Sequence, residues 1–169
     1  MRAGLQPLLL VALLFTLAAG MGAGVPLQSG QPPPQSDRIR SGVDHFDRAF
    51  YDLTPRKRDV EASREFDLAA ADFERELAVN PASVEAHRYL ARIHATRKQH
   101  LKAARHYDRV SELRPLDADA CVLAAVEYVE VGRVEDARAR LTTAQSRTSD
   151  PVALARLAEY LNRLDAYPR

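Results

Sequence analysis

A short pattern of small, aromatic and proline residues returns at a fixed interval of 34 residues. The segment LAAADFERELAVNP at 68–81 has an alanine, an aromatic residue four positions later and a closing proline, and KAARHYDRVSELRP at 102–115 has the same three features in the same places. DARARLTTAQSRTS at 136–149 repeats the small and the large position. The positions in register are Ala69, Ala103 and Ala137, then Phe73, Tyr107 and Leu141, then Pro81 and Pro115. Such a period indicates a chain built from stacked copies of one structural unit.

Each copy of this pattern follows a stretch with the periodicity of an amphipathic helix. Apolar residues at 84–99 and 118–133 recur every three to four positions, and Gly132 stands where a tight turn between two helices is needed. These apolar positions are Ala86, Tyr89, Leu90 and Ile93 in the first stretch, and Ala120, Leu123, Ala124 and Tyr128 in the second. One helix pair cannot bury its apolar faces alone, so stacking of successive pairs must make the core. The sequence therefore predicts an all-α fold.

The period and the residue types resemble the tetratricopeptide repeat family. With Val84 as position 1, the residues that fit the family's preferences are Leu90 at position 7, Ala91 at 8, Ala103 at 20, Tyr107 at 24, Val110 at 27 and Pro115 at 32. The chain departs from the pattern at position 4, which is His87 or Cys121, and at the usual turn glycine, which is Lys98. The resemblance implies a right-handed superhelical array of antiparallel helix pairs, an α-solenoid, with a C-terminal capping helix.

The array is expected to cover 38–167, after a proline-rich linker at 25–37. Its units are expected at about 43–83, 84–117 and 118–150, with the capping helix at 151–165. The capping helix begins at Pro151 and carries one apolar face, which consists of Leu154, Leu157, Leu161 and Leu164.

The first unit is expected to be longer than the others. An apolar stripe predicts its first helix, formed by Ile39, Val43, Phe46, Phe50 and Leu53. Thr54 and Pro55 have the residue types of an N-cap and a first helical turn, which predicts a second helix that runs to Val79. A helix of that length implies an insertion of about two turns. The insertion would bear the basic cluster Arg56, Lys57 and Arg58.

The N-terminal residues have the layout of a secretory signal peptide. Arg2 precedes an apolar run at 8–19, and small residues follow it. We expect residues 1–24 to be this signal, with cleavage near Gly20 or Gly24. The protein is then exported, either to the periplasm or out of the cell. If the segment stays uncleaved, it would instead anchor the chain in a membrane.

The sequence has no spacing that predicts catalysis, so no enzyme activity, cofactor or metal is expected. The histidines are scattered, although His87 and His94 share one helix face. Packing is their expected role, and ligand binding or pH sensing is the alternative.

Cys121, the one cysteine, cannot form an intramolecular disulfide and is expected to be a buried thiol. With Lys+Arg 24 against Asp+Glu 23, the charge gives no reason to expect a nucleic acid partner.

What remains is a binding surface. In the family, the first helices of the repeats line a groove with positions 2, 5, 9, 12 and 13. Carried over to this chain, with Pro151 as position 1 of the last helix, these positions give the candidate groove residues Arg88, Arg92, Val122, Val126, Val129, Glu159, Asn162 and Arg163. The resemblance implies that such a groove holds a protein or peptide partner.

Val122, Val126 and Val129 form a second apolar stripe on their helix, and a helix that is apolar on two faces buries both. This stripe packs against the N-terminal stripe or a second copy of the chain, or it forms a groove floor beside Arg88 and Arg92. Such a floor would receive a peptide with apolar anchors and an acidic group. The asparagines of the family's carboxylate clamp are missing, so the acidic C-terminus of a chaperone is not the expected ligand. By family analogy, we expect a non-catalytic exported adaptor in the assembly of an envelope complex, with a self-associating scaffold subunit as the alternative.

Overall fold

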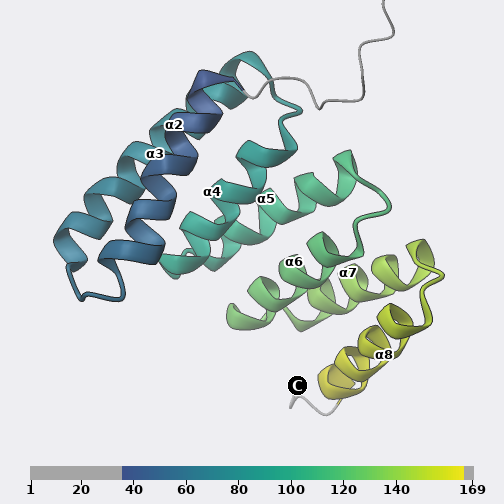
Figure 1. Ribbon diagram of the computed structural model, residues 1–169. Coiled ribbons are helices and arrows are strands. Elements are labelled where there is room, and N and C mark those ends of the chain that lie inside the picture. Colours follow the sequence, from purple (N-terminus) through teal and green to yellow (C-terminus); the bar gives the residue numbers. More distant parts are fainter. Residues whose placement is uncertain (1–35, 166–169) are drawn as a thin grey trace, which may run out of the picture. The chain divides into compact units, whose positions relative to one another are not determined.

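The computed structural model describes residues 36–165, and within this range every regular element is a helix (Figure 1). The elements are α2 (Asp37–Asp47), the π-helix η1 (Arg48–Leu53), α3 (Asp59–Val79), α4 (Val84–Thr96), α5 (His100–Leu113), α6 (Ala118–Glu130), α7 (Val134–Arg147) and α8 (Pro151–Asp165). Each helix packs mainly on its neighbours in the chain, and α2 also packs on α4. This order of contacts is that of an α-solenoid, so the predicted fold class is confirmed. None of the helices in this range is both long enough and apolar enough to span a membrane.

Small residues line the contacts between helices. The three alanines of the repeated pattern, Ala69, Ala103 and Ala137, have no exposed surface. The large residue four positions later in each copy fills the adjacent space and is also buried: Phe73, Tyr107 and Leu141. The pairing of a small with a large residue lets the helices approach closely without leaving a void.

The first helix of each pair begins at a side-chain cap. Ser83 Oγ accepts a hydrogen bond from the Ala86 N–H at 3.3 Å, and Asp117 Oδ1 accepts one from the Ala120 N–H at 3.2 Å. Ser36 caps α2 in the same way. The second helices α3, α5 and α7 have no such side-chain cap. Each of them instead follows a residue with positive φ, which turns the chain tightly between the two helices of a pair.

The positions of these three turn residues show where the second helix of the first unit begins, which differs from the prediction. They are Lys57, Lys98 and Gly132, with φ of 56°, 55° and 74°. The interval from Lys98 to Gly132 is the 34-residue period, whereas Lys57 precedes Lys98 by 41 residues, seven more. The extra seven residues lie in α3, which has 21 residues where α5 has 14.

The predicted helix start at Thr54 and Pro55 was therefore wrong. The chain turns there, and Thr54 closes the preceding π-helix: its N–H and its Oγ1–H both donate to the Ala49 carbonyl, at 3.0 and 2.8 Å. The helix begins only at Asp59, so the basic cluster Arg56, Lys57 and Arg58 lies in the turn and not in the insertion.

The π-helix also changes the predicted stripe of the first helix. Ile39, Phe46 and Leu53 are buried as expected, but Phe50 is 37% exposed, and Ala49 is buried in its place. A π-turn has one more residue than an α-turn, so the positions after it are rotated relative to an uninterrupted helix. Phe50 consequently stacks on Phe46 from outside the core, with ring centroids 5.5 Å apart.

A polar junction joins three successive helices in the second half of the array. The Asp108 carboxylate of α5 accepts a hydrogen bond from Tyr128 Oη of α6 at 2.8 Å, and it pairs with Arg140 of α7, whose Nε lies 2.7 Å from Oδ1. Burial, followed by the hydrogen bond to Asp108, raises the pKa of Tyr128 above its ordinary value. The phenol therefore stays a donor at neutral pH, which fixes the relative positions of α5, α6 and α7.

Replacing Asp108 with Ala should lower the free energy of unfolding by about 2 kcal/mol, because Arg140 and Tyr128 lose their shared acceptor in a partly buried place. Urea denaturation followed by circular dichroism measures the change. Glu112→Ala is the matched control on the same helix, since Glu112 pairs with Arg109 at the surface, and it should cost no more than about 0.5 kcal/mol. Equal losses in the two variants would contradict the structural role of Asp108.

Replacing Lys98 with Gly should stabilise the protein by up to about 1 kcal/mol, because a side chain in the left-handed region costs energy that glycine avoids. Gly132→Ala should have the opposite effect, about 1 kcal/mol of destabilisation. Lys102→Gly, inside α5, is the control: there the same change should destabilise by about 1 kcal/mol. The strain at Lys98 would be refuted if both lysine-to-glycine variants lost stability.

Candidate functional site

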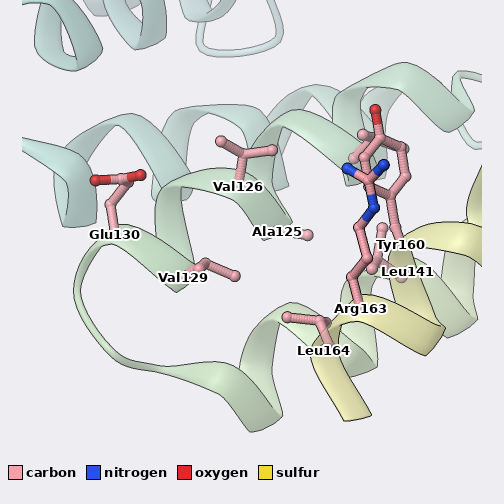
Figure 2. A pocket seen from close by; sticks show the side chains of 9 residues that line it. Ala125, Val126, Val129, Glu130, Leu141, Tyr160, Arg163 and Leu164 are labelled. Atoms are coloured by element: carbon pink, nitrogen blue, oxygen red, sulfur yellow. The ribbon is translucent and has the colours of Figure 1, made fainter. Parts of the chain in front are cut away.

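The first helices α4, α6 and α8 line several cavities, and two of these also have residues of α5 or α7 in their walls. The first cavity has a volume of about 200 Å³ and lies between α6, α7 and α8 (Figure 2). It is lined by Val122, Ala125, Val126, Val129 and Glu130 from α6, Leu141 from α7, and Tyr160, Arg163 and Leu164 from α8. We call this space the valine cavity.

The valine cavity is apolar inside and charged at its edge. Figure 2 shows Val129 of α6 and Leu164 of α8 pointing into the space between them, with Glu130 at the end of α6. The valines contribute side chains of fixed shape, because branching at Cβ restricts χ1. Val126 is 45% exposed and Tyr160 39% exposed, so apolar surface of this cavity is in contact with solvent.

The second cavity, of about 240 Å³, lies between α4, α5 and α6. It is lined by Arg88, Tyr89 and Arg92 from α4, Tyr107 and Val110 from α5, and Asp119, Ala120 and Leu123 from α6. We call it the arginine cavity. Leu123 was expected in the core but is 43% exposed there, and Cys121 and Ala124 are the residues that α6 buries fully.

The two arginines of this cavity are held differently. Arg88 of α4 forms an ion pair with Asp117, which caps α6, so its charge is matched within the protein. Arg92 instead lies over the Phe46 ring, with Cζ 4.4 Å from the ring centroid, and Nη2 donates to Tyr51 Oη at 3.4 Å. Among residues 36–165, no carboxylate forms an ion pair with Arg92. Its position on aromatic rings keeps the guanidinium in place through a cation–π interaction.

The structure groups the predicted site residues into two places rather than one. Arg88 and Arg92 line the arginine cavity, whereas Val122, Val126, Val129 and Arg163 line the valine cavity. The predicted groove floor beside the arginines is therefore divided between two cavities. Glu159 and Asn162 are exposed and line neither, although Glu159 accepts a hydrogen bond from Arg163 at 2.5 Å.

Glu159 and Asn162 lie outside the two cavities because the candidate positions on α8 were counted from Pro151. The strict period of 34 residues leads from Val84 through Ala118 to Val152, one residue after Pro151. With Val152 as position 1, the family's groove positions become Ala153, Arg156, Tyr160, Arg163 and Leu164. Tyr160, Arg163 and Leu164 line the valine cavity. Ala153 and Arg156, together with Tyr160, line a further cavity of about 210 Å³ between α6 and α8. Tyr160 and Leu164, which the sequence interpretation missed, were thus predictable from the period alone.

No group of three or more His, Cys, Asp or Glu side chains between residues 36 and 165 has a geometry that could hold a metal ion. Cys121 is a fully buried free thiol, as predicted. His45 of α2 pairs with Glu65 of α3 at 2.7 Å, and His100 of α5 pairs with Glu127 of α6 at 2.8 Å. The other three histidines contact one another between α4 and α5.

The geometry defines a repeat array with cavities along its first helices, and the comparisons with known proteins agree on the repeat. The profile of the tetratricopeptide repeat family matches residues 58–120, which include α3, α4 and α5. No curated protein matches the sequence.

Two solved structures resemble this one. The N-terminal domain of stress-induced protein-1 (STI-1) from C. elegans superposes with a TM-score of 0.52 at 14% sequence identity, covering 78% of this chain and 99% of that domain. A mutant of MamA superposes with a TM-score of 0.44 at 17% identity, covering 77% of this chain and 92% of the other. The first likeness establishes the fold, that of tetratricopeptide-like helix pairs.

Proposed function

We propose that this protein is a non-catalytic adaptor that binds a peptide segment of another protein across α4, α6 and α8. The valine cavity is the observation that carries the proposal. Apolar side chains of Val126 and Tyr160 stay exposed there around a space of about 200 Å³, although α6 buries Ala124 and Tyr128 and α8 buries Leu157. An apolar side chain from a partner would cover this surface and remove it from water.

The charged residues beside the cavities indicate which residue types the partner peptide should carry. Arg92 offers a guanidinium held on aromatic rings, without an ion-pair partner among residues 36–165. A carboxylate of the partner would supply that charge, and arginine binds carboxylates in bidentate geometry. The peptide that fits has one large apolar residue for the valine cavity and an acidic residue for the arginine cavity. Because α6 lines both cavities, one short segment lying across α6 would reach both.

Peptides selected by phage display against the full chain should carry an apolar and an acidic residue, and Val126→Asp should weaken their binding at least about tenfold. The reason is that the new carboxylate would be desolvated by the apolar side chain. Isothermal titration calorimetry with the selected peptides measures the affinity. Val131→Asp is the matched control: Val131 ends the same helix, is 41% exposed and lines neither cavity, so affinity should be unchanged. Equal binding by wild type and Val126→Asp would refute the site.

A second copy of the chain is the other occupant that an exposed apolar cavity allows. Light scattering on the full chain distinguishes the two cases. A monomer is expected for the adaptor. An oligomer that Val126→Asp dissociates would instead identify a self-associating scaffold subunit.

We also propose that the protein is exported and serves the assembly of an envelope complex. The support is the sequence of the first 24 residues, which lie outside the described range: Arg2 followed by an apolar run and small residues. Mass spectrometry of the protein purified from the exported fraction should find an N-terminus near Gly20 or Gly24. Recovery of the intact chain from the membrane fraction would show an uncleaved anchor, and recovery from the cytosol would refute export.

A further inference from the structure

Three half-buried histidine rings contact one another where α4 packs on α5. His87 Nδ1 lies 2.9 Å from His106 Nδ1, and the His94 ring stacks on the His106 ring with centroids 5.4 Å apart. His87 and His94 share a face of α4, as the sequence predicted, and His106 reaches them from α5. The three rings form one continuous group across the helix pair, which we call the histidine cluster.

The hydrogen bonds of the cluster determine where its protons lie at neutral pH. His87 Nε2 is 3.2 Å from the Pro81 carbonyl, which can only accept, so Nε2 carries the proton of the neutral ring. His87 Nδ1 is then an acceptor, and His106 Nδ1–H donates to it. His94 Nδ1 contacts Gln99 Oε1 at 2.7 Å, so that nitrogen is a donor as well. All three rings are therefore satisfied as neutral imidazoles.

An added proton fits poorly in this arrangement. On His87 it would enter at Nδ1 and face the N–H of His106 across 2.9 Å, so the present hydrogen bond would be lost. On His106 it would charge the ring that lies between the other two. Burial, followed by the neighbouring imidazoles, lowers the pKa of His106 to about 4. Burial also lowers the pKa values of His87 and His94.

The surrounding charged side chains do not compensate for a positive charge on the cluster. Those acting on His87 and His94 come from α3, from the end of α4 and from α5, and they are Glu74, Arg97, Lys102, Arg109 and Glu112. Three are cations and two are anions. No carboxylate among them acts on His106; the charges that lower the pKa of His106 are those of the other two imidazoles.

We propose that the histidine cluster makes the packing of α4 on α5 sensitive to acid, so that the helix pair is held while the rings are neutral and loosens as they are protonated. The sign follows from the lowered pKa of His106: the unfolded or opened chain binds more protons than the closed pair. The contribution of His106 to the stability of the helix pair is fully present above the ordinary histidine pKa of about 6.5. It is lost as the pH falls toward about 4. This is a property of the fold and stands without the peptide site.

The consequence for the peptide site rests on the proposed function. Arg88 and Arg92 project from α4 into the arginine cavity. Loosening α4 would displace both arginines relative to α6, and acid would then release a peptide bound there.

The chain contains a matched comparison for the cluster. His100 of α5 pairs with Glu127 of α6 at 2.8 Å, so the neighbour of this ring is a carboxylate rather than another imidazole. A change at His100 should therefore leave the contact of His106 with α4 intact.

Hydrogen–deuterium exchange of the full chain without any ligand tests the proposal. Between pH 7 and pH 5, after correction for intrinsic exchange rates, protection of the α4 and α5 amides should fall about tenfold more than that of the α7 amides. His106→Gln, which can still donate to His87 but does not titrate, should remove this difference. His106→Phe, which keeps the ring, should do the same. His100→Gln is the control and should retain the difference.

Two results would overturn the inference. One is a loss of protection that is uniform over α4 to α7, which would indicate general acid destabilisation. The other is an unchanged loss in both His106 variants, which would assign the effect to other groups. Because exchange is measured without peptide, neither result depends on whether the valine cavity binds one.

Discussion

Close contact between helices at alanine positions is the interaction on which the array depends. Ala69, Ala103 and Ala137 are fully buried at equivalent places in successive units, and each sits beside a large residue that fills the remaining space. A larger side chain at any of them would separate two helices and open the core on both sides. The stacking of pairs, the position of α6 between two cavities and the contacts between α4 and α5 all follow from this spacing.

Because α6 is so rich in alanine, its outward residues become available for other contacts. Its buried face consists mainly of Ala120, Ala124 and Ala125 with Cys121 and Tyr128, so the neighbouring helices lie close to its backbone. The larger residues Val122, Leu123, Val126 and Val129 are then left around the two cavities. A packing requirement on one side of this helix thus produces an apolar surface on the other. The same geometry explains why one helix can serve both cavities.

The repeat, the helix pairing and the all-α fold were predictable because they depend on residue type at a constant interval. The exposure of Phe50 was not predictable from the apolar stripe. It follows from the π-helix, in which Thr54 donates to the Ala49 carbonyl, and the stripe does not indicate which carbonyl accepts that bond. Lys57 likewise adopts a backbone conformation that its residue type disfavours, so the turn of the first unit gave no glycine signal. Tyr160 was missed for a different reason, an error of one residue in the frame, which the period itself corrects. The contact between His106 and His87 could not be predicted from the sequence, because it depends on the rotation of α5 against α4.

The seven additional residues of α3 have a consequence for how this array can change in length. Buried residues follow one another along α3 at spacings of four and three: Ala62, Phe66, Ala69, Phe73 and Glu76. This is a heptad pattern, and seven residues bring a helix back to almost the same orientation, with a drift of only about 20°. An insertion of that length extends the helix while leaving its contact face aligned with α2 and α4. Insertions of four or five residues would rotate the outer part of the same face away from its neighbours. The seven additional residues therefore lengthen α3 without turning its buried face away from α2 and α4.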